Sequence, residues 1–182
     1  MFRISKDTPA LYFTSVAAHR LPVFQTDKLK NVTCRALDEA RRSGGFLLFA
    51  YVIMPDHIHG VAGSDLKPSK TMQFINGIIS RRVIDYLKEA GYAGSLEKLR
   101  QQEKERRYRY SLWEHHSNTM FLTSESVFMQ RVNYIHNNPV RAGLVERPED
   151  YRWSSARRWK EPADDDSLQV DIDQIAWKVG KA

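Results

Sequence analysis

The stretch MPDHIHG, residues 54–60, carries two histidines that are separated by one apolar residue, Ile58. In an extended strand the side-chain period is two, so His57 and His59 would share one face of a sheet while Ile58 points to the other. Two neutral imidazoles on a rigid support are the first ligands that a divalent metal ion needs. The same spacing also arises by chance, so the pair alone does not establish a metal site.

A second group of polar residues lies in QRVNYIHNNPVRAGLV. On a helix, Gln130, Tyr134 and Asn138 stand one turn apart, with Arg131 beside them, at the edge of a separate apolar stripe. Two interpretations stay open. Tyr134 is either a core tyrosine whose hydroxyl is satisfied, or a phenol that faces a polar site where Asn138 offers a neutral oxygen ligand. His136 would point about 200° away from Tyr134 and is not counted as a ligand.

These residues need a scaffold, and the hydrophobic periodicity predicts one. The first half of the chain should hold a strand in 10–19, a helix from Thr26 or Asp27 to Gly44-Gly45, a central strand in 46–54 and its hairpin partner from residue 57. The second half should hold a helix from Pro68 to Gly91, a short strand in 118–122, and a helix that Ser124 caps and Pro139 ends. This order predicts an α+β fold. We expect a ferredoxin-like or RRM-like four-stranded antiparallel sheet with helices packed on one face, and a C-terminal extension.

Length and charge limit the class of protein. The 182 residues suit a single domain, and the overall charge is +6. Residues 161–182 hold six acidic side chains and two lysines, so residues 1–160 carry a charge of +10. We expect a domain over 1–160, with a basic insertion at about 91–112, and an acidic tail over 161–182. The basic excess and the interleaved aromatic residues favour a nucleic-acid partner.

The remaining composition points to the cytoplasm. A single cysteine, Cys34, excludes an internal disulfide and fits a reducing compartment. We expect it to be a small buried residue rather than a nucleophile. No apolar run reaches the roughly 18 residues of a membrane span, and the N-terminus lacks the pattern of a signal peptide. We therefore predict a cytoplasmic protein that joins the nucleoid when it binds DNA and has no membrane partner.

The motifs PDHIHG, YIHNNPVRAGLV and PEDYRWSSA, in this order, resemble the single-tyrosine HUH transposases of insertion sequences. The resemblance covers roughly residues 9–160 and is strongest to the REP-associated tyrosine transposase branch. It implies that His57 and His59 are the HUH histidines and that Tyr134 is the nucleophile. Asn138 stands where relatives outside this branch carry a metal-binding Gln. The implied metal ligands are thus His57, His59 and Asn138, and the implied cofactor is Mg²⁺ or Mn²⁺.

The resemblance also implies an activity. Members of the family cleave single-stranded DNA beside a hairpin, form a 5′-phosphotyrosine and free a 3′-hydroxyl that can rejoin the strand without ATP. We therefore expect a metal-dependent transposase, a single-strand DNA endonuclease that acts in DNA transposition and recombination at REP-like hairpins. A catalytically silent, hairpin-binding regulator of repeat elements is the main alternative, and a phosphohydrolase of small nucleotides is a third. A monomer and a homodimer are equally compatible with the sequence.

Basic and aromatic residues are the candidates for DNA contacts, because lysine and arginine bind phosphates and aromatic rings stack on bases. The aromatic candidates are Tyr108, Tyr110, Trp153 and Trp159. Ser154 and Ser155 could cap a terminal helix rather than touch DNA. The predicted DNA-binding residues are Arg81, Arg82, Arg106, Arg107, Arg109, Arg131, Arg141, Arg152, Arg157 and Arg158.

Overall fold

The structure is a computed structural model that describes residues 1–101, 109–114, 117–161 and 168–176. Its strands are β1 (Phe2–Arg3), β2 (Ala10–Val16), β3 (Leu47–Ile53), β4 (His57–Gly63), β5 (Asn118–Leu122) and β6 (Ile175–Ala176). Its α-helices are α1 (Asp27–Gly44), α2 (Pro68–Glu89), α3 (Ala93–Lys98), α4 (Glu125–Arg141) and α5 (Ala156–Lys160), and short 3-10 helices cover Ala18–Arg20, Pro148–Asp150 and Ile172–Gln174. No helix in these ranges has the length and hydropathy to cross a membrane.

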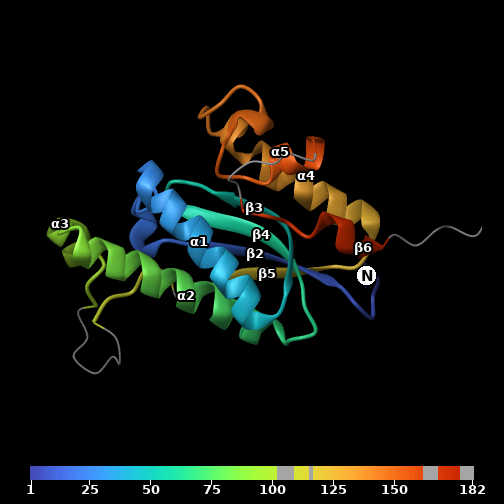
Figure 1. Cartoon of the computed structure of the whole chain (residues 1–182), viewed down its shortest axis with the longest axis horizontal. Coiled ribbons are helices and arrows are strands. Elements are labelled where there is room, and N and C mark those ends of the chain that lie inside the picture. The colour runs from blue at the N-terminus through green and yellow to red at the C-terminus, as the bar shows by residue number, and fades with distance from the viewer. Residues whose placement is uncertain (102–108, 115–116, 162–167, 177–182) are drawn as a thin grey trace, which may run out of the picture.

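The main sheet has the strand order β3-β4-β2-β5, and all its neighbours are antiparallel. With α1 between β2 and β3 and α2 between β4 and β5, this is the ferredoxin-like arrangement that the sequence predicts (Figure 1). The short strand β5 is confirmed. The expectation that the apolar run at 46–54 forms a central strand is wrong, because β3 lies at one edge of the sheet.

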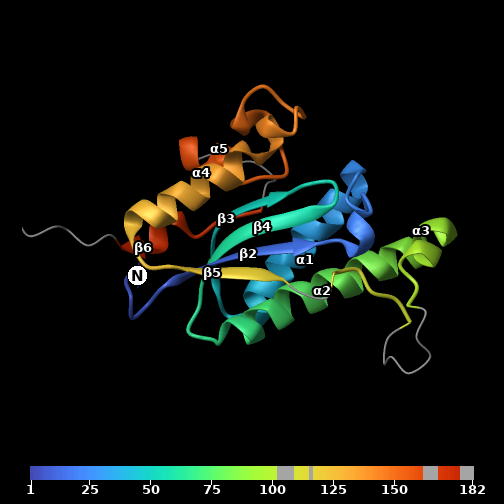
Figure 2. The same ribbon diagram turned by 180° about the vertical axis from the view of Figure 1, so that it is seen from behind.

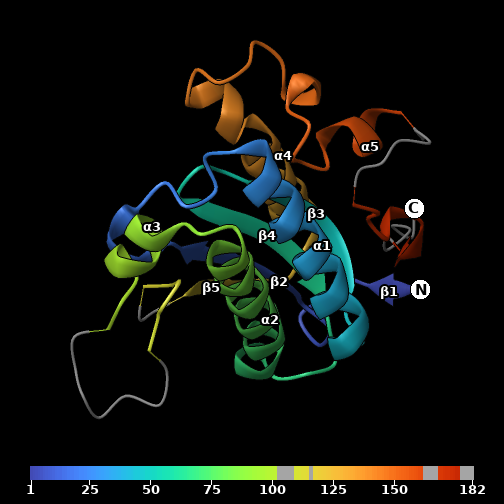
Figure 3. The ribbon, with the colours of Figure 1, turned by 60° about the vertical axis from the view of Figure 1, so that its left-hand side comes forward.

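The long helices lie on both sides of the sheet. Figure 3 shows α1 and α2 side by side on one face, while α4 crosses the other. The helices that were expected on one face of the sheet are therefore α1 and α2, and α4 covers the opposite face in addition. The face that α4 covers is the one on which Val61 of β4 packs with Val132 and Ile135 of the helix.

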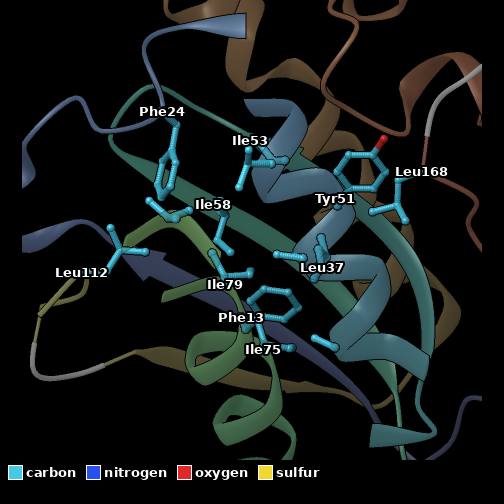
Figure 4. Packing of buried hydrophobic residues seen from close by; sticks show 14 of the residues in the cluster. Phe13, Phe24, Leu37, Tyr51, Ile53, Ile58, Ile75, Ile79, Leu112 and Leu168 are labelled. Carbon is cyan, nitrogen blue, oxygen red and sulfur yellow. The ribbon is translucent and has the colours of Figure 1, made fainter. Parts of the chain in front are cut away.

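The larger core lies between the sheet and the α1–α2 pair. Phe13 on β2, Leu37 on α1 and Ile75 and Ile79 on α2 are fully buried and meet there (Figure 4). The sequence signals that bound α1 are confirmed: the Thr26 hydroxyl accepts a hydrogen bond from a backbone N–H of the first turn, and the helix ends at a glycine in the left-handed region. Burial on this scale holds the sheet rigid beneath the opposite face.

The backbone groups on the outer edge of β3, which no neighbouring strand pairs, are hydrogen-bonded to the C-terminal part of the chain. The Ile53 N–H donates to the Trp153 carbonyl, and the Ser155 hydroxyl accepts from the Tyr51 N–H at 3.0 Å. The Trp159 indole donates to the Phe49 carbonyl at 2.9 Å. Because unpaired edge groups would otherwise recruit another strand, these bonds explain how an edge strand can be so apolar.

Part of the predicted acidic tail belongs to the fold. Leu168 and Val170 are buried in the larger core, and β6 pairs with β1 in parallel. Asp171 accepts a hydrogen bond from the Leu48 N–H at 2.8 Å and forms an ion pair with Arg41 at 3.0 Å. This acidic residue therefore supports the sheet edge, whereas residues 162–167 and 177–182 of the tail lie outside the described ranges.

Helix α4 begins where the sequence predicts, because the Ser124 hydroxyl accepts a hydrogen bond from the Val127 N–H. The prediction that Pro139 ends the helix is wrong: α4 continues to Arg141, and Gly143 follows in the left-handed region with φ of 68°. A proline disrupts only the turn that precedes it, and here that loss falls in the last turn of the helix. The extension places Arg141 on the same helix as Tyr134.

Candidate active site

The two histidines and the tyrosine meet on the face of the sheet that α4 covers. On β4, His57 and His59 point to this face, and their ring centroids are 4.8 Å apart. Tyr134, from the middle of α4, lies with its ring centroid 5.6 Å from that of His59. The strand and the helix thus bring together the two motifs that are 75 residues apart in the sequence.

His57 is held by the acidic residue of the preceding turn. Its Nδ1 lies 2.6 Å from Oδ1 of Asp56, and both side chains are largely buried. The second Asp56 oxygen accepts a hydrogen bond from Arg20 at 3.2 Å. A carboxylate that accepts from Nδ1–H fixes the tautomer of the ring and makes the other nitrogen a better ligand. Nε2 of His57 makes no hydrogen bond with a described residue.

His59 is held by two hydroxyl groups of β2 instead. Its Nδ1 lies 2.7 Å from Thr14 Oγ1 and 3.0 Å from the Tyr12 hydroxyl. The single hydroxyl proton of Thr14 goes to the Tyr12 oxygen, so Thr14 Oγ1 can accept a hydrogen bond from Nδ1–H of His59. In the tautomer that this acceptor suits, the Nε2 lone pair of His59 is left for another partner.

The protonation state of His59 also favours a role as a metal ligand. Burial of the ring, which has the largest effect, and the nearby His57 lower the pKa of His59 to about 3, although the Asp56 carboxylate acts in the opposite direction. The imidazole is therefore neutral near pH 7, as a metal ligand must be. Two imidazoles, each with Nδ1 occupied and Nε2 unbonded within the described part, fit a divalent cation.

A third protein ligand would have to be an amide. Among the described residues, no group of three or more His, Cys, Asp or Glu side chains could hold a metal ion. Asn138 lies one turn after Tyr134, and its Nδ2 donates to the Tyr134 carbonyl at 3.1 Å. This bond leaves Oδ1, the atom that a cation would need, without a bond to a described residue. Gln130, one turn before Tyr134, is exposed.

Two arginines flank the tyrosine. The guanidinium carbon of Arg141 lies 5.3 Å from the Tyr134 ring centroid, and that of Arg131 lies 5.9 Å from the same ring and 5.2 Å from the ring of Tyr12. Nε of Arg131 is buried and has no hydrogen-bond partner. A buried donor without a partner is costly unless a ligand satisfies it. These cations would suit a phosphate group beside Tyr134.

His136, as expected, takes no part in the site. It is buried on the other side of α4, and its Nε2 is hydrogen-bonded to the Ser155 hydroxyl at 2.8 Å. Burial lowers the pKa of His136 to about 4, which keeps the ring neutral. Ser155, which also bonds Tyr51, makes no side-chain capping bond to α5, but the Ser154 hydroxyl accepts a hydrogen bond from the Ala156 N–H, the first of that helix, at 3.2 Å. The serine pair of the WSSA motif is thus a structural feature.

Six of the other predicted DNA-binding arginines lie in the described part of the chain. Arg81 and Arg109 line a groove beside α2, whereas Nε and Nη2 of Arg82 donate to the Glu39 carboxylate at 2.8 Å and 2.7 Å. Arg157 donates to the Glu149 carbonyl, Arg152 is exposed and Arg158 is half-buried. Arg106 and Arg107 lie outside the described residues.

The aromatic candidates divide in a similar way. Tyr110 lines the groove beside α2. Trp153 donates to the Asn31 side chain at 3.0 Å, and Trp159 packs against Phe128. The two tryptophans are therefore bonded or packed within the protein, and Tyr108 lies outside the described ranges.

Sequence reasoning did not assign three residues of the site. The sequence places Tyr12 and Thr14 in a strand and Asp56 in a turn, and it gives none of the three a role in the site. The period-two spacing of Tyr12 and Thr14 puts both on one face, but only the register Thr14↔His59 reveals that this face carries the histidines. The position of Asp56 next to His57 was a signal that sequence alone could have used.

The fold and the site together are those of a single-tyrosine HUH protein: a ferredoxin-like sheet presents a histidine pair to a tyrosine on a covering helix. The sequence profile of the family "Transposase IS200 like" matches residues 10–138, which is most of the chain. The chain therefore belongs to the IS200-like transposase family and is a DNA-binding transposase by membership. No curated protein matches the sequence.

A solved structure agrees on the fold. The structure of a REP-associated tyrosine transposase bound to a REP hairpin superposes with a TM-score of 0.60 at 16% identity, covering 93% of this chain and 89% of that one. A protein from Deinococcus radiodurans R1, described as a candidate transposase, has a TM-score of 0.48 at 20% identity, covering 70% of this chain and 88% of that one. The first of these likenesses confirms the predicted fold class.

Proposed function

We propose that the protein is a metal-dependent single-strand DNA transesterase that cleaves beside REP-like hairpins through Tyr134. The observation that carries the proposal is the cluster of His57, His59 and Tyr134, with ring centroids 4.8 Å and 5.6 Å apart. Hydrogen bonds from the described residues occupy only Nδ1 of each histidine. The hairpin as partner is inferred from the REP-bound relative, which shares the fold.

His57, His59 and Oδ1 of Asn138 would hold the cation, Mg²⁺ or Mn²⁺, of which the second tolerates nitrogen ligands better. When bound, it would polarise the scissile phosphate and neutralise charge that develops on its oxygens. Asp56 and the Thr14–Tyr12 pair orient the two imidazoles. Each ring is thus fixed before DNA arrives, which reduces the reorganisation needed during reaction.

In the proposed reaction, the Tyr134 hydroxyl oxygen attacks phosphorus and the bond from phosphorus to the 3′-oxygen breaks. The proton that the phenol loses is balanced by the proton that the leaving oxygen takes up as it becomes a 3′-hydroxyl. Arg131 and Arg141 would bind the non-bridging oxygens, which places the phosphate next to the tyrosine. The phosphotyrosine keeps one ester bond for the one broken, so the same 3′-hydroxyl can attack and rejoin the strand.

The test is adduct formation. Wild type, Tyr134→Phe and Tyr12→Phe are incubated with 5′- and 3′-labelled single-stranded hairpin oligonucleotides from the gene's own flanks, with Mg²⁺ or Mn²⁺. We expect a metal-dependent covalent band in wild type and in Tyr12→Phe, and none in Tyr134→Phe. Tyr12 is the matched control because it is the other phenol at the site.

Two outcomes would contradict the proposal. Tight hairpin binding without an adduct under either metal would favour the catalytically silent regulator. Release of product without any protein-bound intermediate, unaffected by Tyr134→Phe, would favour hydrolysis by a metal-activated water, as in the phosphohydrolase alternative.

A further inference from the structure

A groove of about 1150 Å³ runs along α2, on the side of the sheet opposite Tyr134. One wall is the outer surface of α2, and the other is formed by Gln101 and by residues 109–113, which lead toward β5. The groove takes no part in the site described above. Its position and its lining raise the question of what it holds.

The unpaired charge in the groove is positive. Arg81 is exposed and has no hydrogen bond or ion pair with a described residue, and among the described residues the Arg109 guanidinium contacts only the Tyr110 ring, at 5.5 Å. The acidic residues of the lining already have partners: Glu39 is paired with Arg82, outside the lining, and Asp85 lies 3.8 Å from Lys88. A polyanion therefore fits this groove better than a cation or a neutral ligand.

Aromatic rings accompany these cations. Lys70 lies 5.3 Å from the ring of Phe74, Lys88 lies 5.7 Å from that of Tyr110, and both rings line the groove. Cations that track a backbone and rings that stack on bases are the features of a single-strand binding surface.

The groove and the active site lie back to back at the same level of the sheet. Adjacent residues of β2 point to opposite faces, so Thr14 bonds His59 while the hydroxyl of Ser15 donates to Asn76 of the groove at 2.7 Å. In the register of the sheet, Asn118 of β5 pairs with Thr14. Only β2 and β5 separate His59 from the open edge, a distance of about 10 Å.

We propose that this groove binds the single-stranded DNA that flanks the bond cleaved at Tyr134, with the strand passing around the β5 edge. β5 lies at the open edge of the sheet and next to α2 (Figure 2), whereas residues 153–159 cover the β3 edge, so the path between groove and site crosses β5. The proposal rests on the proposed function and adds to it a second DNA contact on the other face of the sheet.

Gly77 allows a sharp test. It lies in α2 on the floor of the groove, and a Cβ added there would meet nothing within 4 Å. Because glycine is a poor helix former, substitution should keep or raise the stability of α2. Gly77→Glu, Gly77→Gln and Gly77→Lys therefore change the charge of the groove without disturbing the core. Gly77→Gln is the control for size.

Two probes are used, a fluorescein-labelled oligothymidylate of about ten nucleotides and the hairpin with and without a flanking single strand of that length. At low salt we expect Gly77→Glu to bind oligothymidylate and the extended hairpin about tenfold more weakly than Gly77→Gln, and Gly77→Lys to bind them at least as tightly. The hairpin without a flank should bind equally to all three. The affinities are measured by fluorescence anisotropy.

Equal affinities of the three variants for both single-stranded probes would overturn the proposal, as would failure of the wild type to bind them. Adduct formation separates this result from the proposed chemistry. An adduct without any effect of charge at Gly77 would reject the groove and keep the transesterase. A charge effect without an adduct would reject the transesterase and keep the groove as a binding surface.

Discussion

Asp56→Asn should weaken binding of Mn²⁺ about tenfold. The Asp56 carboxylate lies 2.6 Å from Nδ1 of His57, and partners of this kind are typically worth 10–100-fold in metal affinity. The net value of a hydrogen bond to a charged group, about 1.5–3 kcal/mol, corresponds to a similar range. The asparagine oxygen can still accept from Nδ1–H, so the substitution removes mainly the charge, and we expect the lower end. Asp56→Ala removes the acceptor as well, and we expect about a hundredfold.

The assay is titration of Mn²⁺ followed by electron paramagnetic resonance of the free ion, without DNA. Arg20→Ala is the control, because Arg20 contacts the same carboxylate from the exposed side. Exposed ion pairs contribute little, so its effect should stay within about twofold. The backbone bond from the Ala17 N–H to the Asp56 carbonyl is retained in every variant, which preserves the turn. Affinity unchanged in Asp56→Asn but lost in His57→Ala would refute the reasoning.

Three further predictions concern stability and can be measured by thermal or urea unfolding. Ser155→Ala should lower the free energy of unfolding by about 1–3 kcal/mol, because it leaves the buried Tyr51 N–H and His136 Nε2 without this partner. Ser154→Ala loses only local bonds and should lower it by about 1 kcal/mol or less. Gly60→Ala should cost about 1–3 kcal/mol, since a Cβ there would lie 2.4 Å from the ring of Phe13. The free energy of unfolding should fall as the pH drops from about 6.5 toward about 4, by about 3 kcal/mol from each of His136 and His59, because the folded protein keeps both imidazoles neutral while the unfolded chain protonates them; a flat profile would contradict this.

The sequence was enough to predict most elements of the fold. Periodicity placed β2, β3, β4 and the long helices, and local signals such as Thr26 and Ser124 placed two helix starts, because such signals depend only on neighbours in the chain. It misjudged β3 as central, since periodicity reports that both faces of a strand are buried and not whether its edges are paired. The C-terminal residues that cover this edge are more than 90 positions away in the sequence.

The site could be predicted only in part. The histidine pair and Tyr134 could be proposed from their motifs, but their contact depends on which face α4 covers, and a helix pattern does not contain that information. The hydroxyl groups that hold His59 were hidden for the same reason. Thr14 is an ordinary strand residue until the register of β2 and β4 sets it opposite His59.

One edge of the sheet is covered by other parts of the chain and the other is open, and this difference is consistent with the proposed path of DNA. The β3 edge is occupied by bonds from residues 153–159 and by Asp171, which would exclude another strand. On the opposite edge, β5 pairs with β2 and with no other strand of the described residues, and most of its residues are exposed, including Phe121 at 54%. An open edge invites aggregation unless it has a function. At this edge the cations beside Tyr134 and those along α2 lie on opposite sides of a single layer, so one strand of DNA can reach both only by crossing β5.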